Sequence, residues 1–341
     1  MERVMRSLQI VVTGGAGFLG SHLVRRLIAQ GHAVVALDNL QTGDRANLSD
    51  LLDHPRLTFL EHDVLEPYDL PCDRIYNLAC PASPRDYQHD PVRTTLTSVL
   101  GSHHALELAQ RTGARLLQAS TSEIYGDPEC HPQPEGYRGS VSPHGLRACY
   151  TEGKRCAESL VMDFHRVHRV DVRIARVFNS FGPGMRLDDG RVVINFVRQA
   201  LTGCPLTLYG DGQQTRSLCY VDDLIGGLIG LMEQTDHQGP VNLGNPIERT
   251  ILQIAHAVLE QIPGGTLSYL PLPGDDPRRR CPDISLARSL FGFEPSVSLD
   301  EGLAATIADV RARLGRATPT DDSRIPRAPD RTTSLETEQN G

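Results

Sequence analysis

Two side chains that could perform acid–base chemistry, Tyr150 and Lys154, stand four residues apart along the chain. Residues at that spacing lie on one face of a helix. A lysine ammonium beside a tyrosine hydroxyl favours the phenolate, so we expect a lowered pKa for Tyr150 and a general-base role near neutral pH. Among the 34 lysines and arginines Lys154 is the single lysine, and a planar guanidinium replaces a compact ammonium poorly. The alternative is a helix-surface pair without a chemical role.

Three further polar residues, Thr121, Ser122 and Glu123, follow an apolar run that ends at residue 119. In an open α/β sheet the ligand crevice lies at the ends of the strands. The two hydroxyls could hold a substrate hydroxyl against Tyr150, while Glu123 would bring a carboxylate or a carboxylic acid to the same place. The sequence therefore predicts one catalytic centre built from this segment and the Tyr150 helix.

A glycine-rich segment, residues 13–20, lies between the first apolar run and the first helical pattern. Gly14, Gly17 and Gly20 have the spacing of a dinucleotide-binding turn, which needs a tight bend, close approach to a pyrophosphate and close helix packing. The helix N-terminus adds N–H donors and a positive dipole end. Asp38, at the end of the next apolar run, would accept hydrogen bonds from the adenosine ribose, which favours NAD over NADP. The alternative is a purely structural glycine turn.

A sheet with helices must position these residues, and the first half of the chain alternates between strand and helix patterns. Such alternation indicates a parallel sheet covered on both faces. We predict the α/β class, with a Rossmann-type doubly wound parallel sheet and a smaller C-terminal substrate-binding lobe. The expected strands are residues 8–13, 33–37, 57–60, 74–78, 114–119 and 171–177, and the expected helices are residues 17–30, 92–110 and 150–168.

After residue 179 the pattern changes to shorter strands separated by turns rich in glycine and proline. We predict an NAD-binding domain over residues 1–178, which carries the Tyr150 helix, and a substrate lobe over residues 179–314 that is interleaved with it. Residues 315–341 lack apolar periodicity and are expected to be a disordered tail. The expected strands of the second half are residues 206–209, 216–221 and 241–243, and its expected helices are residues 192–201, 222–232, 251–261 and 299–314.

The overall composition, 39% hydrophobic and 22% charged residues, is that of an ordinary globular protein. The net charge of −8 gives no basic field, so we expect no nucleic-acid partner and no membrane partner. No apolar run is long enough to span a bilayer. The eight cysteines include no CxxC pair, which favours reduced thiols in the cytoplasm over disulfides or a zinc site. His165 and His168 share a helix face, but no further ligand completes a site, so we expect no metal.

Several longer motifs point to a particular family. ACPASP (residues 79–84), STSE (residues 120–123) and RRRCPDI (residues 278–284) occur together with VTGGAGFLGSHL (residues 12–23) and YGDGQQTRSLCYVDDL (residues 209–224). Through them the chain resembles the extended short-chain dehydrogenases and, more narrowly, the UDP-glucuronate decarboxylases, also called UDP-xylose synthases. The resemblance covers about residues 9–314.

The resemblance implies NAD as cofactor, a nucleotide sugar (UDP- or TDP-glucuronate) as substrate, and a homodimer in which the helices at 92–110 and 150–168 pair with their copies. The implied cofactor site is Gly14, Ala16, Gly17, Phe18, Leu19, Asp38, Asn39, Asp63, Val64, Leu78, Ala79, Tyr150 and Lys154. The implied substrate site is Pro81, Glu123, Asn179, Arg191, Val192, Asn195, Tyr209, Arg216 and Arg280. The implied catalytic residues are Thr121, Ser122, Glu123, Tyr150, Lys154 and Arg280.

The implied reaction is a redox-neutral decarboxylation. Tyr150 takes the proton of the sugar C4 hydroxyl while C4 gives a hydride to NAD⁺. The C4 ketone makes the C6 carboxylate a β-keto acid, which loses CO₂ through an enolate stabilised by Tyr150 and Thr121. A water near Ser122 and Glu123 then protonates C5, and the hydride returns to C4. Arg280 would orient the substrate carboxylate or diphosphate.

Five positions depart from the family pattern: Ser98, Thr151, Phe164, Val167 and Gly184. They leave open how much 4-keto pentose escapes before the final reduction, and whether the nucleobase is uracil or thymine. A 4-epimerase of the same superfamily and an NAD-sensing regulatory protein are the alternative functions, and residues 278–280 could instead be a solvated basic run.

Overall fold

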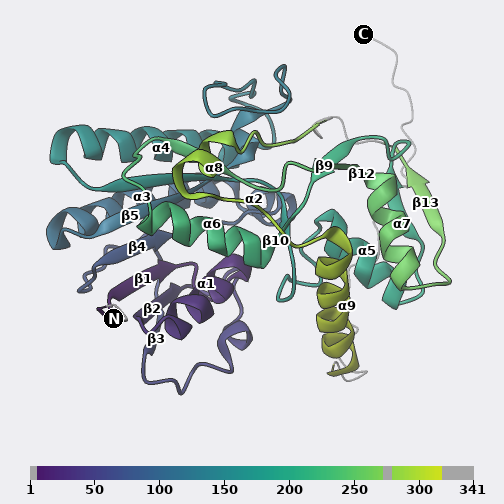
Figure 1. Cartoon of the computed structure of the whole chain (residues 1–341), viewed down its shortest axis with the longest axis horizontal. Helices are drawn as coiled ribbons and strands as arrows, with labels where there is room; N and C mark the ends of the chain where they lie inside the picture. Colours follow the sequence, from purple (N-terminus) through teal and green to yellow (C-terminus); the bar gives the residue numbers. More distant parts are fainter. Residues whose placement is uncertain (1–5, 272–278, 317–341) are drawn as a thin grey trace, which may run out of the picture.

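The computed structural model describes residues 6–271 and 279–316. A seven-stranded sheet, in which every neighbouring pair of strands is parallel, crosses the larger part of the molecule (Figure 1). From edge to edge its strands are β11 (Pro240–Leu243), β6 (Val172–Val177), β5 (Arg115–Thr121), β4 (Arg74–Asn77), β1 (Gln9–Thr13), β2 (Ala33–Asp38) and β3 (Leu57–Glu61). The inner strands are almost continuously buried, as expected for a sheet covered on both faces.

Alternate residues of a strand point to opposite sides of the sheet. Because both sets are apolar here, helices cover both faces. Val12 and Leu117 pack on one side and their neighbours Val11 and Leu116 on the other. The first side is covered by α1 (Phe18–Ala29), α6 (Val221–Glu233) and α8 (Ser285–Phe291). The second is covered by α3 (Pro91–Thr112) and α4 (Ala148–His168), which pack against each other (Figure 1). The predicted doubly wound α/β fold is confirmed.

A second hydrophobic core lies in the part of the molecule that Figure 1 shows away from β1–β3. Its helices are α5 (Val192–Leu201), α7 (Ile251–Gln261) and α9 (Leu299–Arg316). Its short strands form three pairs, β10 (Cys219–Tyr220) with β7 (Ser180–Phe181), β12 (Glu248–Thr250) with β9 (Thr215–Ser217), and β13 (Leu267–Leu270) with β8 (Leu206–Tyr209). A reciprocal pair of hydrogen bonds between Thr250 and Gln253 starts α7.

The predicted helices are present, and most predicted strands begin and end within a few residues of their expected bounds. The single strand predicted at residues 216–221 is wrong. It is interrupted at Leu218, so β9 and β10 are separate, and Val221 already begins α6. The strands β7, β12 and β13 and the helices α2 (Pro84–His89) and α8 were not predicted, because segments this short carry little periodic signal.

The second half of the chain contributes to both cores. β11 pairs with β6 at the edge of the central sheet, and α6 and α8 pack on that sheet. The last helix, α9, continues past the predicted end at residue 314 to Arg316. Arg278 and residues 317–341, most of the predicted tail, lie outside the described residues.

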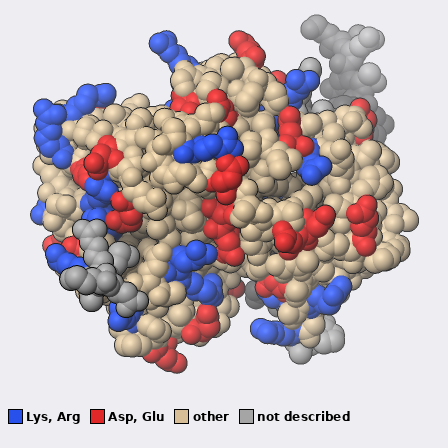
Figure 2. All heavy atoms as spheres, viewed as in Figure 1, with Lys and Arg blue, Asp and Glu red and all other residues tan. Residues whose placement is uncertain are grey.

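The surface visible in Figure 2 carries side chains of both charges. Acidic and basic side chains are interspersed over the face shown in Figure 2. Among the described residues no helix combines the length and the apolar character needed to cross a membrane.

Candidate active site

The glycine turn between β1 and α1 has the backbone geometry that a dinucleotide requires. Gly14 has a φ of +68°, a conformation that side chains disfavour. A Cβ on Gly20 would lie 1.9 Å from the carbonyl oxygen of Gly14, so only glycine lets the helix pack this closely on the turn. Gly17 stands immediately before α1 and donates to that carbonyl at 3.1 Å. Gly17, Phe18 and Leu19 at the N-terminus of α1 line a cavity, so this helix end can face an anionic ligand.

Asp38, the last residue of β2, holds this turn. Its carboxylate accepts hydrogen bonds from the backbone nitrogens of Ala16 at 3.0 Å and Leu40 at 2.8 Å. Burial raises the pKa of Asp38, and these backbone hydrogen bonds oppose the rise. The side chain still lines the cavity, so a ribose hydroxyl could reach it. Asp38 therefore fits the predicted role and also fastens the glycine turn to the sheet.

A cavity of about 770 Å³ extends from the glycine turn to the second core, a size that accommodates a ligand. It brings most of the predicted site together: Gly14, Gly17, Phe18, Leu19, Asp38, Asn39, Val64, Leu78, Ala79, Pro81, Thr121, Ser122, Glu123, Tyr150, Lys154, Asn179, Arg191, Val192, Asn195, Tyr209 and Arg216 line it. Three predicted residues do not line it. Ala16 turns its backbone nitrogen to Asp38, Asp63 binds Asn39 and Arg93, and Arg280 is buried behind the wall.

Tyr150 lies in this wall, 6% exposed, with its ring stacked on that of Tyr87 at 5.0 Å between ring centres. Burial raises its pKa, Cys80 and Glu123 raise it further, and a hydrogen bond with the Thr121 side chain lowers it. The predicted lowering of the Tyr150 pKa is therefore wrong. The reason is desolvation, which disfavours the phenolate more strongly than the hydrogen bond with Thr121 favours it.

Lys154 lies one helical turn beyond Tyr150 and is 4% exposed. Its Nζ donates to the carbonyl oxygen of Ala119 at 2.9 Å and lies 5.9 Å from the centre of the Tyr150 ring. The predicted pair therefore shares one helix face. The ammonium thus contacts a backbone carbonyl near the end of β5 and lies over the face of the Tyr150 ring. It does not contact the tyrosine hydroxyl.

Glu123 is held between two arginines. Its Oε2 accepts from Arg147 at 3.1 Å, and its Oε1 accepts from Arg280. Burial alone would raise the pKa of Glu123, but the charges and hydrogen bonds of Arg280 and Arg147 together hold it below the usual range. Of the two forms left open by the sequence, the structure thus favours the carboxylate.

The two arginines on Glu123 have different surroundings. Arg280 is 2% exposed and also donates to the carbonyl of Gly126 at 3.1 Å, so it supports Glu123 from behind. Arg147 lines the cavity. Sequence reasoning missed Arg147, although it lies one turn before Tyr150 and Thr151, at the start of α4. The same helical spacing that linked Tyr150 to Lys154, extended one turn backwards, could have found it.

The second core contributes basic and amide groups to the far part of the cavity. Arg191 precedes α5, pairs with Asp189 at 2.5 Å, and places its guanidinium 6.0 Å from the centre of the Phe18 ring. Asn195 donates to the carbonyl of Gly190 at 2.8 Å. Arg216 comes from β9 and also lines the cavity. Guanidinium groups at this end suit the phosphates of a nucleotide sugar.

Two groups of potential metal ligands occur among the described residues, and neither lines the cavity. They are His103 with His104 and Glu107, and His131 with Glu248 and Cys281. His165, considered in the sequence, instead bonds the carbonyl of Val170.

The chain is similar to known proteins in sequence and in fold. The NAD dependent epimerase/dehydratase family matches residues 10–244. UDP-glucuronic acid decarboxylase 1 of Arabidopsis thaliana is 54% identical over 310 residues, which cover 91% of this chain and 71% of that protein. The solved structure of UDP-glucuronic acid 4-epimerase from Bacillus cereus, in complex with UDP-glucuronic acid and NAD, aligns with a TM-score of 0.77 at 27% identity, over 89% of this chain and 99% of that one. A dTDP-glucose 4,6-dehydratase of Streptomyces venezuelae with NAD bound gives 0.80 at 27% identity, over 90% and 98%.

The family match extends from β1 to the end of β11, so it includes the whole central sheet, the glycine turn and the helix that carries Tyr150 and Lys154. The relatives that exceed half identity over nine-tenths of the chain are decarboxylases, whereas the 4-epimerase and the dehydratase share the fold at 27%. This chain therefore belongs to the NAD dependent epimerase/dehydratase family and, within it, to the UDP-glucuronic acid decarboxylases.

Proposed function

We propose that this protein is an NAD-dependent decarboxylase that converts UDP-glucuronate to UDP-xylose and CO₂. The observation that carries the proposal is one cavity wall in which Thr121, Glu123, Tyr150 and Lys154 meet, in a chain 54% identical to a UDP-glucuronic acid decarboxylase. The glycine turn, Asp38 and Lys154 would hold NAD. When bound, NAD⁺ accepts a hydride from the sugar C4 and returns it at the end of the cycle.

Tyr150 and Thr121 act at the C4 oxygen. Tyr150 accepts the hydroxyl proton as C4 becomes a ketone, which makes the C6 carboxylate a β-keto acid. The C5–C6 bond breaks, CO₂ leaves, and the electron pair forms an enolate whose oxygen receives hydrogen bonds from Tyr150 and Thr121. Because burial raises the pKa of Tyr150, the positive charge of Lys154 is needed to let the tyrosine accept and return this proton.

Glu123 serves the second proton transfer. Its lowered pKa keeps it a carboxylate at neutral pH, so it orients a water together with Ser122. That water protonates C5, and the hydroxide left behind takes up a proton from solvent, so the cycle consumes one proton for each CO₂ released. Arg147 lies on the cavity side of Glu123 and would face the C6 carboxylate. Arg191, Asn195 and Arg216 would hold the diphosphate and sugar.

Product analysis tests the reaction. Incubation with UDP-glucuronate or TDP-glucuronate and NAD⁺ should give a product lighter by the mass of CO₂, and the preferred nucleotide identifies the base. A 4-epimerase, the alternative supported by the fold of the Bacillus cereus enzyme, would conserve the substrate mass. We further propose that some 4-keto pentose escapes, which would leave NADH on the enzyme. Product NMR showing xylose only, without NADH, would contradict that addition.

The site assignment is tested by two substitutions. Tyr150→Phe removes the proton acceptor, and Lys154→Arg replaces the compact ammonium in a site that is 4% exposed. Each should lower kcat by about 10²-fold or more, whereas Arg26→Lys, on the exposed side of α1, should leave it unchanged. Normal turnover by Tyr150→Phe would favour the NAD-sensing alternative.

We also propose the two-lobe division at residues 178/179, a homodimer and a cytoplasmic location. The side-by-side helices α3 and α4 expose Leu96, Leu100 and Val167 at 42%, 38% and 71%, which supports a second copy on that face. Sedimentation should show dimers that Leu100→Glu converts to monomers. All eight cysteines are free thiols, which agrees with a reducing compartment.

A further inference from the structure

A buried ion pair joins α4, the catalytic helix that carries Tyr150 and Lys154, to the central sheet. Glu158 lies on α4, one turn beyond Lys154, and its carboxylate accepts from Arg176 of β6 through Nε at 3.0 Å and through a second nitrogen at 2.8 Å. Ser120, next to Thr121 in β5, donates to the same carboxylate. Only 13% of the Glu158 side chain and 10% of that of Arg176 are exposed.

The part of the Arg176 guanidinium that does not contact Glu158 also has hydrogen-bond partners. Its remaining terminal nitrogen donates to the hydroxyl of Tyr125 at 3.0 Å and to the carbonyl of Glu135 at 2.8 Å. The guanidinium also lies 5.1 Å from the centre of the Tyr125 ring. One arginine thus joins the catalytic helix to the segment that follows Thr121 and Glu123.

The same polar network continues to the segment that carries Arg280. The Tyr125 hydroxyl donates to Asn242 at 2.7 Å, and the Asn242 amide donates to the carbonyls of Gln133 at 2.9 Å and Asp283 at 3.0 Å. The Gln133 side chain accepts from the backbone nitrogen of Cys281, the residue after Arg280, at 2.9 Å. Tyr125, Gln133 and Asn242 are completely buried.

We propose that Glu158 and Arg176 are positioning residues for the decarboxylation. Apolar contacts alone let a helix slide or rotate on a sheet, whereas a two-point ion pair fixes both the distance and the rotation. The pair would set Tyr150 against Thr121, and its extension through Tyr125 and Asn242 would hold Arg280 against Glu123. None of Glu158, Arg176, Tyr125 and Asn242 lines the cavity, so they act through other residues. The proposal rests on the roles of Tyr150 and Lys154 given above.

Glu158→Gln tests it, because the neutral amide keeps the shape and loses the ion pair. A small displacement of Tyr150 should lower kcat by about 10²-fold, with KM for the nucleotide sugar and the affinity for NAD largely retained. The pH dependence of kcat should shift, because Tyr150 no longer meets the same neighbours. Glu152→Gln is the matched control on the same helix, since Glu152 contacts Arg155 at the surface. It should leave kcat and its pH profile unchanged.

Tyr125→Phe should give a smaller loss of kcat, because it breaks only the link from Arg176 to Asn242. Ser120→Ala, which removes one hydrogen bond to Glu158, serves if Glu158→Gln does not fold, and it should shift the same pH profile. A wild-type kcat and pH profile in folded Glu158→Gln would overturn the proposal. An inactive Tyr150→Phe beside a normal Glu158→Gln would reject this inference alone, whereas an active Tyr150→Phe would reject the proposed site itself.

Discussion

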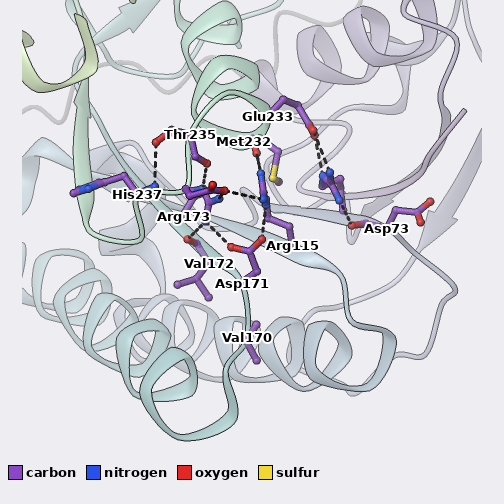
Figure 3. Close-up of polar contacts among 12 residues, drawn as sticks. Asp73, Arg115, Val170, Asp171, Val172, Arg173, Met232, Glu233, Thr235 and His237 are labelled. Carbon is purple, nitrogen blue, oxygen red and sulfur yellow. Dashed lines mark hydrogen bonds and ion pairs between the residues drawn. The ribbon is translucent and has the colours of Figure 1, made fainter. Parts of the chain in front are cut away.

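Strand β5 connects two clusters built from the same residue types, one at each of its ends. At its beginning, Asp171 accepts from Arg115 and Arg173, both at 2.6 Å (Figure 3). Just past its other end, Glu123 accepts from Arg147 and Arg280. In both clusters burial alone would raise the pKa of the carboxyl group, but the charges and hydrogen bonds of two guanidinium groups together lower it.

The cluster around Asp171 closes the end of a helix. Arg115 donates to the carbonyl of Met232 at 2.7 Å and Arg173 donates to that of Thr235 at 2.8 Å, at the C-terminal end of α6. Positive groups at that end satisfy the last carbonyls and interact favourably with the helix dipole. None of these residues lines the cavity.

The cluster around Glu123 forms part of the cavity wall instead. Glu123 and Arg147 line the cavity, and only Arg280 is hidden behind them. The contrast shows that a carboxylate between two arginines does not identify a catalytic site. What distinguishes the two is their surroundings, a helix end in one case and a ligand cavity beside Tyr150 in the other.

Among the substitutions that compare the two clusters, Glu123→Gln should have the largest effect. The neutral amide neither balances the two guanidinium groups nor orders the water for C5, so kcat should fall by about 10²-fold or more. Asp171→Asn makes the same chemical change at the other end of β5 and should leave kcat of the folded enzyme unchanged. Turnover of both variants, measured by CO₂ release, compares them. Normal turnover by Glu123→Gln would mean that the Glu123 cluster, like the Asp171 cluster, has only a structural role.

Much of the site could be predicted because its parts are close together in the sequence. Gly14 and Gly17 belong to one turn, Thr121 and Glu123 to another, and each lies beside a clear strand or helix pattern. The parallel sheet could be predicted for the same reason, since its strands alternate with long helices. Local spacing and periodicity were sufficient for these features.

Features that depend on distant contacts or on burial could not be predicted. Arg173 meets Thr235 far along the chain, and no local pattern marks either residue. The pKa of Tyr150 was expected to be lowered because the spacing reveals Lys154, whereas the desolvation that raises it depends on the packing around the ring. Arg280 was expected at the substrate, because a motif does not reveal on which side of Glu123 the guanidinium lies.

Arg173→Met should have an effect of intermediate size. It should lower the free energy of unfolding and leave kcat unchanged. Arg173 is completely buried, and its loss leaves Asp171 with one partner and the Thr235 carbonyl without its donor. Because 42% of the Asp171 side chain is exposed, the loss should cost about 2 kcal/mol of unfolding free energy, the size of a hydrogen bond to a charged group. Urea unfolding measures the loss, with Arg166→Met as control, because Arg166 pairs with Asp163 on the surface. A fall in kcat without a fall in stability would show that this cluster also serves the reaction.

The smallest expected effect is a difference in acid sensitivity. A carboxyl group whose pKa is lower in the folded than in the unfolded protein stabilises the fold above its unfolded pKa, about 3.9 for Asp and 4.3 for Glu. That contribution is lost as the pH falls through the lower, folded pKa. The difference in unfolding free energy between the wild type and Asp171→Asn should therefore be largest at neutral pH. This stability gap should become smaller as the pH falls. Because both arginines of the Asp171 cluster remain charged throughout, the narrowing reports the carboxyl group alone. Urea midpoints of the two proteins across the acid range would measure it, and a gap that widens as the pH falls would mean that Asp171 is not held ionised by Arg115 and Arg173.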